Sequence, residues 1–361
     1  MPITSTVVTL LIFTIIVVAH EFGHFIVARK NGILVEEFAV GLGPKLIGWQ
    51  PGETLFTLRL IPLGGYCKML DGDEENINNP RAYNSKKVWQ RMAVCFAGVT
   101  MNFLLAVVLG SIIISTTSIN TTTITHVLPN TPAEAAGFLP GDRLVRIDGR
   151  RVRSFQDIGR FINMSGAQQI DIVVRRDGAL QTIPVTPRYE AAFDSYMLGI
   201  SPVRAGFLSP RRAYLPVAGP IQTLGGGLEL SVYSVRLVLD GLSMLINRQV
   251  DVGDMAGPLG IGQAINHNLQ AAAATEAPAR SMFLSSVYIA MLLSANLAVL
   301  NLLPIPALDG GRLIFLIIEG VRRKPLPPEK EGWIHFAGFV LVLGLAVLIT
   351  FNDILRIIGA Q

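Results

Sequence analysis

The chain has 361 residues, of which half are hydrophobic and only 16% are charged. Such a composition excludes an ordinary soluble enzyme and favours a membrane protein. The formal net charge of +4 is too small to indicate a nucleic-acid partner, and the two cysteines, Cys67 and Cys95, form neither a CxxC zinc motif nor a disulfide framework. The first residues lack both a basic segment and a small-residue cleavage site, so no removable signal peptide is expected.

Four stretches are long enough to cross a bilayer, which takes about 20 helical residues. Three of them are continuous apolar runs: Ala93–Ser115, Phe283–Leu303 and Trp333–Phe351. The fourth, Val7–Ala28, is purely apolar only as far as Ala19, and it reaches spanning length only if His20, Glu21 and His24 lie inside it. Ionisable side chains at membrane depth are costly, so these three indicate a functional site.

Lysine and arginine gather after the first and third spans, which predicts that these two loops are cytoplasmic. The first group is Arg29, Lys30, Lys45, Arg81, Lys86, Lys87 and Arg91, and the second is Arg322, Arg323, Lys324 and Lys330. Both termini and the long segment after the second span are then expected on the outer side of the membrane.

The loop after the first span has the period of a β-strand. Phe56, Leu58 and Leu60 alternate with polar residues. We expect a β-hairpin or small sheet against the membrane face, with Thr54–Leu60 as an edge strand. A solvated loop without a role is the alternative.

Residues 116–204 are polar and rich in turn residues, which predicts a compact soluble domain inserted between two parts of a membrane core, residues 1–115 and 283–361. Residues 205–282 form a linker. Within it, Gly219–Asn247 has helical spacing interrupted by glycines and charges, which is typical of an interfacial helix. A re-entrant segment is the alternative there.

The segment HEFGH is an HExxH motif, in which His20 and His24 lie on one face of a helix and can bind one zinc ion. Glu21 is then placed to act on water at the metal. A chance match is the alternative in a soluble chain, and a proton relay is the alternative in a membrane chain.

A catalytic zinc needs a third protein ligand, and Asp309 in the segment NLLPIPALDGG is the candidate. Two prolines interrupt the helix before it, and irregular backbone at membrane depth is tolerated where it lines a cavity. Asp309 and the HExxH motif both lie toward the cytoplasmic ends of their spans. A carboxylate that merely caps the following helix is the alternative.

These two motifs together resemble the site-2 protease family of intramembrane zinc metalloproteases. Further segments, GLGP, IPLGGYCKMLDG, AGVTMNF, AGPLGIG and FND, resemble its bacterial RseP-like branch. The resemblance implies that His20, His24 and Asp309 bind one Zn²⁺ and that Glu21 is the general base. It also implies that Asn301 and Pro304 help to hold the substrate, and that the hairpin with Phe56, Leu58 and Leu60 binds extended substrate by strand addition.

The stretch VLPNTPAEAAGFLPGDRLVRIDGRRV resembles the opening of a bacterial PDZ domain. The resemblance implies a peptide groove near Leu198, Gly199 and Ile200. The chain has room for one PDZ domain, whereas the best-known member of the branch has two. A domain that excludes large substrates and binds no peptide is the alternative.

We therefore expect a multi-pass α-helical membrane protein with about four spans, a membrane-associated β-hairpin and an inserted α+β PDZ domain. It is expected in the bacterial cytoplasmic membrane, with the active site toward the cytoplasm. Its expected partners are membrane lipid and single-span membrane proteins, such as anti-sigma factors or signal-peptide remnants, after a first cut outside the membrane. The rivals are a metal or proton transporter that uses the same buried residues and an inactive scaffold that displays the PDZ domain.

Overall fold

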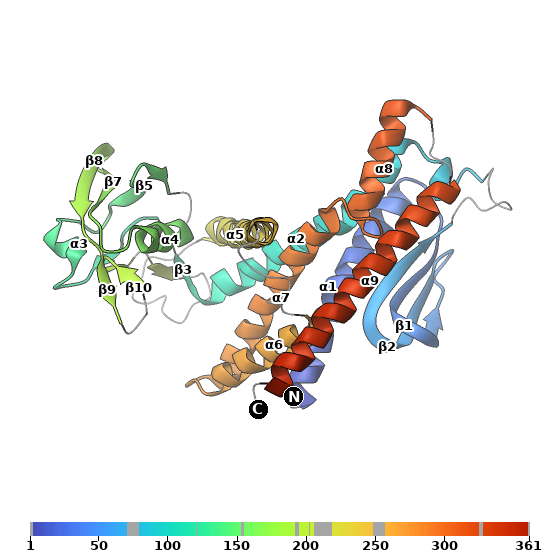
Figure 1. The fold of residues 1–361 in the computed structure, drawn as a ribbon, viewed down its shortest axis with the longest axis horizontal. Coiled ribbons are helices and arrows are strands. Elements are labelled where there is room, and N and C mark those ends of the chain that lie inside the picture. The colour runs from blue at the N-terminus through green and yellow to red at the C-terminus, as the bar shows by residue number, and fades with distance from the viewer. Residues whose placement is uncertain are drawn as a thin grey trace. The chain divides into compact units, whose positions relative to one another are not determined.

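A computed structural model describes residues 3–70, 79–120, 122–152, 155–191, 195–201, 203–205, 219–247, 257–324 and 328–359. The chain divides into two compact units. One comprises Met1–Gly110 and Ser234–Gln361, and the other Ser111–Tyr233. The first holds most of the long apolar helices, and the second is rich in short strands (Figure 1).

The expectation of four helices with the length and composition of membrane spans is confirmed. Four described helices are long and apolar enough to cross a membrane: α1 (Ile3–Lys30), α2 (Val88–Thr116), α7 (Pro278–Leu302) and α9 (Pro328–Gly359). Helix α1 runs without a break through its polar motif, and its 28 residues rise about 42 Å. The start of α1 and the end of α9 lie at the same end of their unit (Figure 1).

Small residues let α1 and α2 approach closely, as is usual between membrane helices. A Cβ atom added to Gly23 of α1 would lie 2.8 Å from the carbonyl carbon of Ala97 in α2. Farther along α1, Ile12 and Ile16 are buried against Ala290 of α7. These contacts fix the position of α1 between its two neighbours.

Two shorter helices, α6 and α8, also belong to this unit. Helix α6 (Pro258–Ala273) packs against α1, α7 and α9. The buried carboxylate of Asp353 in α9 accepts hydrogen bonds from the N–H groups of Gly257 (3.2 Å) and Gly260 (2.8 Å). It thereby provides acceptors for two backbone N–H groups at the start of α6. Helix α8 (Asp309–Arg322) is joined to α2 by an ion pair between Glu319 and Arg91. A 3-10 turn, η1 (Tyr83–Ser85), precedes α2.

Strands β1 (Val35–Trp49) and β2 (Leu55–Met69) bend so strongly that they form four limbs of one sheet beside α1 (Figure 1). Residues 55–58 pair with residues 37–40 on one side and with residues 47–49 on the other. The expectation that Thr54–Leu60 is an edge strand is therefore wrong. Among the described residues, the edges are residues 45–49 and 61–69, because each of these limbs has a paired neighbour on one side only.

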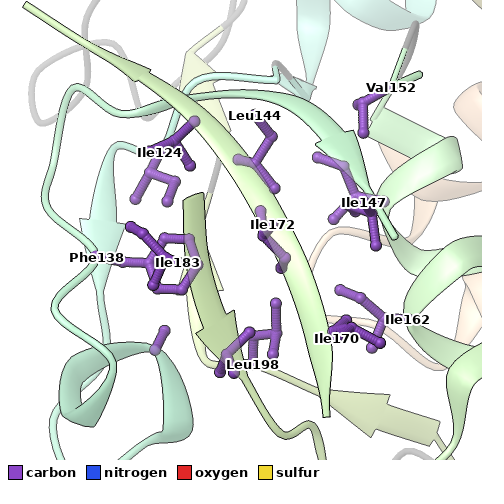
Figure 2. Packing of buried hydrophobic residues seen from close by; sticks show 14 residues of the cluster. Ile124, Phe138, Leu144, Ile147, Val152, Ile162, Ile170, Ile172, Ile183 and Leu198 are labelled. Carbon is purple, nitrogen blue, oxygen red and sulfur yellow. The ribbon is translucent and has the colours of Figure 1, made fainter. Parts of the chain in front are cut away.

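The second unit is built around a four-stranded sheet in the order β6-β5-β7-β8. Its elements are β3 (Ser118–Asn120), β4 (His126–Val127), α3 (Pro132–Ala135), β5 (Arg143–Ile147), β6 (Arg150–Arg151), α4 (Phe155–Ser165), β7 (Ile170–Arg176), β8 (Ala179–Val185), β9 (Arg188–Glu190), β10 (Ser195–Met197), β11 (Ile200–Ser201) and β12 (Val203–Ala205). Helix α5 (Pro220–Ile246) begins in this unit and ends in the first one. Figure 2 shows buried residues such as Leu144, Ile147 and Ile172 packed on one side of the sheet, together with Ile162 of α4.

An ion pair between Arg176 and Asp142 stabilises the start of β5. Arg176 donates to both carboxylate oxygens of Asp142, each at 2.7 Å, and the N–H of Leu139 donates to the same carboxylate at 2.9 Å. Burial by itself would raise the pKa of Asp142, but these hydrogen bonds outweigh it and hold the pKa below its usual range.

The predicted linker, residues 205–282, lies partly outside the described residues, at 206–218 and 248–256. Of the described part, Gly219–Asn247 is almost entirely the helix α5, and α6 follows it.

Candidate active site

His20 and His24 lie one turn apart on the same buried face of α1, as the HExxH spacing requires. The Nδ1–H of His24 donates to the carbonyl oxygen of Val94 in α2 at 2.8 Å. This bond fixes the tautomer of His24 and leaves the lone pair of its Nε2 free for a metal. The Nε2 atoms of the two rings are 3.1 Å apart.

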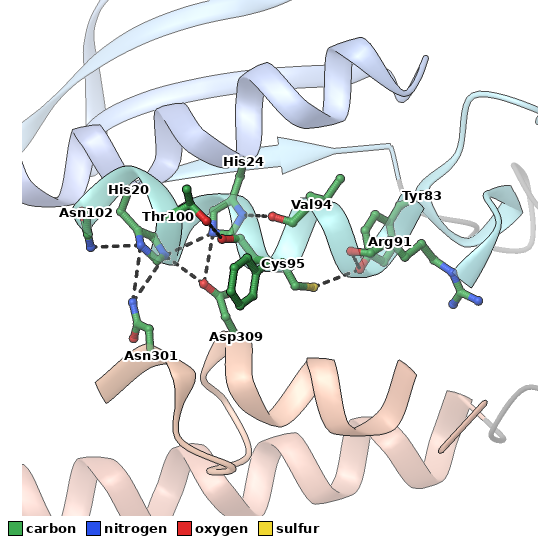
Figure 3. Close-up of polar contacts among 11 residues, drawn as sticks. His20, His24, Tyr83, Arg91, Val94, Cys95, Thr100, Asn102, Asn301 and Asp309 are labelled. Atoms are coloured by element: carbon green, nitrogen blue, oxygen red, sulfur yellow. Dashed lines mark hydrogen bonds and ion pairs between the residues drawn. The ribbon is translucent and has the colours of Figure 1, made fainter. Parts of the chain in front are cut away.

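Asp309 joins the two histidines from the first turn of α8 (Figure 3). Its Oδ2 lies 3.1 Å from Nε2 of His20 and 3.3 Å from Nε2 of His24. Asp309 does not cap α8, because Leu308 holds the N-cap position and no side chain bonds there. The three side chains come from segments more than 280 residues apart, and only the fold brings them together.

The three ligand atoms fit a zinc ion. Ligands at about 2.0–2.1 Å from a tetrahedral zinc lie about 3.3–3.4 Å from one another, close to the distances found here. Oδ2 of Asp309 is buried and accepts no hydrogen bond from the described residues, although it faces two imidazole nitrogens. Lone pairs directed at a common point repel unless a cation lies between them. Three protein ligands leave one coordination position open, as in catalytic zinc sites.

The turn between α7 and α8 places Asp309 next to the two histidines. Helix α7 ends at Leu302, and the backbone then folds back so tightly that a Cβ on Gly311 would lie 2.9 Å from the carbonyl carbon of Ile305. Ala307 has a left-handed φ of 80°, and its N–H donates to Nδ1 of His335 in α9 at 3.0 Å. The two prolines of this segment, which cannot donate backbone hydrogen bonds, explain why the helix stops here.

Glu21 lines the same cavity as the three ligand residues, a space of about 440 Å³. The N–H of Cys67, on the edge limb of β2, donates to the Glu21 carboxylate. The other lining residues are Met69, Tyr83, Val94, Cys95, Asn301, Ala307, Leu308 and Arg312. A carboxylate beside a metal site in a cavity that admits water is the arrangement that hydrolysis by a general base requires.

Two asparagines approach His20 from opposite helices (Figure 3). Nδ2 of Asn301 lies 3.4 Å from its Nε2, and Nδ2 of Asn102, a fully buried residue of α2, lies 3.2 Å from its Nδ1. Oδ1 of Asn102 has no hydrogen-bond partner among the described residues. Turning this amide over would let Oδ1 accept the Nδ1–H of His20, which satisfies both groups and frees Nε2 for the metal.

Sequence reasoning named the three residues that the structure brings together, but it missed several of their neighbours. Asn102 and Gly98 belong to the quoted segment AGVTMNF, and no role was assigned to either of them. Gly98 packs directly against both histidine rings. Val94 and His335 gave no signal at all, because one acts through its backbone carbonyl and the other contacts a distant turn.

The remaining predicted contact residues lie outside the cavity lining. Pro304 is exposed in the turn between α7 and α8. Phe56 packs in an aromatic cluster with Phe25, Phe38 and Trp49, with ring centroids 5.7–5.8 Å away. The side chains of Leu58 and Leu60 are 44% and 57% exposed.

Leu198, Gly199 and Ile200 line a separate cavity of about 360 Å³ in the second unit. This cavity lies beside α4 and is mainly apolar, with Phe155, Ile158, Ile162 and Tyr196 among its lining residues. Gly199 has φ of 84°, and a Cβ there would overlap Thr131, so only glycine fits at this position.

Comparisons with known proteins agree with this geometry. Residues 8–345 match the model of peptidase family M50. A putative zinc metalloprotease of Clostridium acetobutylicum is 31% identical over 98% of both chains. The zinc metalloprotease RasP of Oceanobacillus iheyensis is 29% identical over 98% of this chain and 99% of its own. The regulator of sigma-W protease RasP of Bacillus subtilis is 29% identical over 99% of this chain and all of its own. With a family match over nearly the whole chain and relatives named as zinc metalloproteases, the chain belongs to peptidase family M50, the site-2 protease family, and is a zinc metalloprotease.

Proposed function

We propose that this metalloprotease cuts single-span membrane proteins within their transmembrane segments. The observation that carries the proposal is the depth of the ligand set. His20 and His24 lie inside the candidate span α1, and Asp309 follows directly after the interrupted end of the candidate span α7. A peptide bond that meets all three must come from a segment at the same depth.

The residues around the cavity have distinct roles in the proposed reaction. Zinc, when bound by His20, His24 and Asp309, supplies a Lewis acid for the scissile carbonyl and for water. Glu21 removes a proton from the attacking water and delivers it to the leaving amine nitrogen. The N–H of Cys67 holds the Glu21 carboxylate in place for both transfers.

Asn301 is the residue best placed to orient the substrate carbonyl. Its amide lines the cavity next to His20 and has hydrogens to donate. Pro304, by contrast, contributes through the turn, because a proline there stops α7 before Asp309. In this proposal Asn301 contacts the substrate and Pro304 shapes the turn that carries the metal ligand.

A helical substrate must unwind before hydrolysis, and a sheet edge offers its backbone new hydrogen-bond partners. The edge limb, residues 61–69, supports this role better than Thr54–Leu60, because it carries Cys67 and Met69 into the cavity lining. Gly65 on this limb lies against Glu21. We propose that the substrate backbone pairs with residues 61–69. Phe56, Leu58 and Leu60 then contact the substrate through their side chains, because both sides of their limb are already paired.

The physiological substrates are proposed from the relatives. One relative is named as a regulator of a sigma-W factor. The proposed substrates are therefore anti-sigma factors that another protease has already cut outside the membrane. Signal-peptide remnants are a second proposed class. The proposed location is the bacterial cytoplasmic membrane, with both termini and residues 116–204 outside and the active site toward the cytoplasm. The basic loops after α1 and α7–α8 support this orientation.

Residues 116–204 are proposed to be a single PDZ domain. The apolar cavity beside α4 and the left-handed Gly199 support a peptide groove. A domain that only excludes large substrates would need no such cavity, and a peptide-binding assay on the full chain separates the two readings.

Glu21→Gln tests the proposed function directly. This variant should keep its zinc and lose cleavage of a single-span substrate by about 10²–10⁴-fold, the usual contribution of a general base. His24→Ala should lose both zinc and cleavage. Glu36→Gln, which removes a carboxylate from the Lys68 ion pair on the hairpin, is the matched control. Cleavage of the same substrate by Glu21→Gln at the parental rate would exclude this mechanism.

A further inference from the structure

The outward surface of the sheet β6-β5-β7-β8 carries a group of exposed arginines, which we call the arginine face. Its members are Arg143, Arg146, Arg151 and Arg175. Their neighbours Leu144 and Ile147 point into the core (Figure 2), and Val174 is buried in the same cluster. Because side chains alternate along a strand, the arginines share the opposite surface.

The pairing of the strands brings these charges together in pairs. Arg143 of β5 lies opposite Arg175 of β7, and Arg146 of β5 lies opposite Arg151 of β6. Directly opposed residues have Cβ atoms about 4.5–5.5 Å apart, and like charges at that distance destabilise a sheet. Two such pairs in one small sheet are unfavourable for folding and indicate another use.

A bulge contributes to this arrangement. The register of β5 against β7 shifts between Leu144 and Arg146, so Val145 is an extra residue. In a regular strand, Arg146 would lie two residues after Leu144 and would share its inward direction. A β-bulge of this kind re-aims a side chain, here bringing a third arginine to the surface.

None of the four arginines forms an ion pair with any residue that the structure describes. The adjacent Arg176 shows the contrast, since it is held by the buried Asp142. By strand alternation, Asp171 shares the outward surface, farther along β7 and opposite Pro184. The other outward residues of β7 and β8 include Val173, Thr182 and the exposed Leu180.

We propose that the arginine face binds the surface of a membrane that contains anionic lipid. The partner is always within reach, because this unit follows the candidate span α2 directly. Clustered arginines are attracted to anionic headgroups, and each guanidinium can bind a phosphate with two hydrogen bonds. The proposal goes beyond proteolysis and does not depend on the substrate.

The test uses full-length protein in nanodiscs that contain either phosphatidylcholine alone or phosphatidylcholine with phosphatidylglycerol. A fluorophore on Thr182→Cys, on the same surface, reports contact with headgroup-labelled quencher lipid. The native Cys67 and Cys95 are replaced beforehand. Quenching is expected with phosphatidylglycerol only, and it should decrease as salt increases.

Arg143→Gln/Arg175→Gln is the decisive variant. At about five-fold per arginine near an anionic surface, the ratio of bound to free domain should fall about 30-fold. Arg160→Gln/Arg188→Gln removes the same charge from other elements of the unit and should leave quenching unchanged. The decisive variant should unfold at the parental temperature or above it, because a repulsive pair is removed.

Four results would overturn the proposal. Equal quenching in both kinds of nanodisc would exclude anionic lipid as the partner. A lower unfolding temperature for Arg143→Gln/Arg175→Gln would make these arginines structural. Loss of quenching with millimolar inorganic phosphate at constant ionic strength would indicate a site for free phosphate. A fluorescence change with soluble polyglutamate or DNA, and none with phosphatidylglycerol, would indicate a different macromolecular partner.

Discussion

Adding one methyl group at Gly98 should disable the metal site without changing a ligand. Gly98 lies on α2 and faces both histidines. A Cβ there would be 2.5 Å from Nε2 of His24 and 2.6 Å from Cε1 of His20, and real Cβ atoms essentially never approach another atom within 3.0 Å. Gly98→Ala must therefore move the rings or separate α1 from α2.

The size of the effect follows from the geometry. Ordinary contact begins at 3.4 Å, so the ring of His24 must shift by about 0.9 Å. Metal–ligand distances tolerate about 0.2 Å. Helix α1 cannot easily yield as a whole, since Gly23 already packs against the backbone of Ala97. Overpacking of this kind costs about 1–3 kcal/mol. That free energy corresponds to about a 5–150-fold loss in zinc affinity.

The assay is competition for zinc between purified Gly98→Ala and a chromophoric chelator, with cleavage of a single-span substrate measured in parallel. Zinc affinity should fall about 5–150-fold, and cleavage at limiting zinc should fall with it. Gly344→Ala in α9 is the matched control, because no atom lies within 4 Å of its added Cβ. Parental zinc affinity in Gly98→Ala would refute the packing argument.

Three further predictions concern residues other than the candidate ligands. Asn102→Leu should weaken zinc binding about 10–100-fold by releasing His20, whereas Asn102→Asp should retain it; equal chelator competition by both would refute the positioning role. Asp142→Asn should destabilise the second unit by about 1.5–3 kcal/mol at neutral pH. The pKa of Asp142 is lower in the folded protein than in the unfolded chain, where it is about 4. The carboxylate therefore stabilises the fold above that pH, and this stabilisation is lost as the pH falls through the folded pKa. Acid should thus reduce the difference in unfolding temperature between the parent and Asp142→Asn. Asp353→Ala should increase proteolysis at the start of α6, and unchanged protection would show that this cap is dispensable.

Much of the architecture follows from periodicity and hydropathy, which are local properties. Four apolar runs of spanning length predicted α1, α2, α7 and α9, because a bilayer excludes unsatisfied backbone and so imposes long helices. The HExxH spacing placed His20 and His24 on one face of α1, because the period of the helix decides it. The prolines before Asp309 predicted the break after α7 for the same kind of reason.

What the sequence alone left open depends on partners far along the chain. The role of Thr54–Leu60 was misjudged because strand alternation shows which side chains share a face but not which strands are neighbours. The proximity of Asp309 to His20, the role of Asn102 and the tight fit of Gly98 all arise where α2, α7 and α8 meet α1. The bulge that turns Arg146 outward is likewise a property of the pairing between β5 and β7. Local sequence thus determined the elements and named the candidate ligands. Long-range packing decided which surfaces face one another, because such contacts depend on the positions of several elements at once.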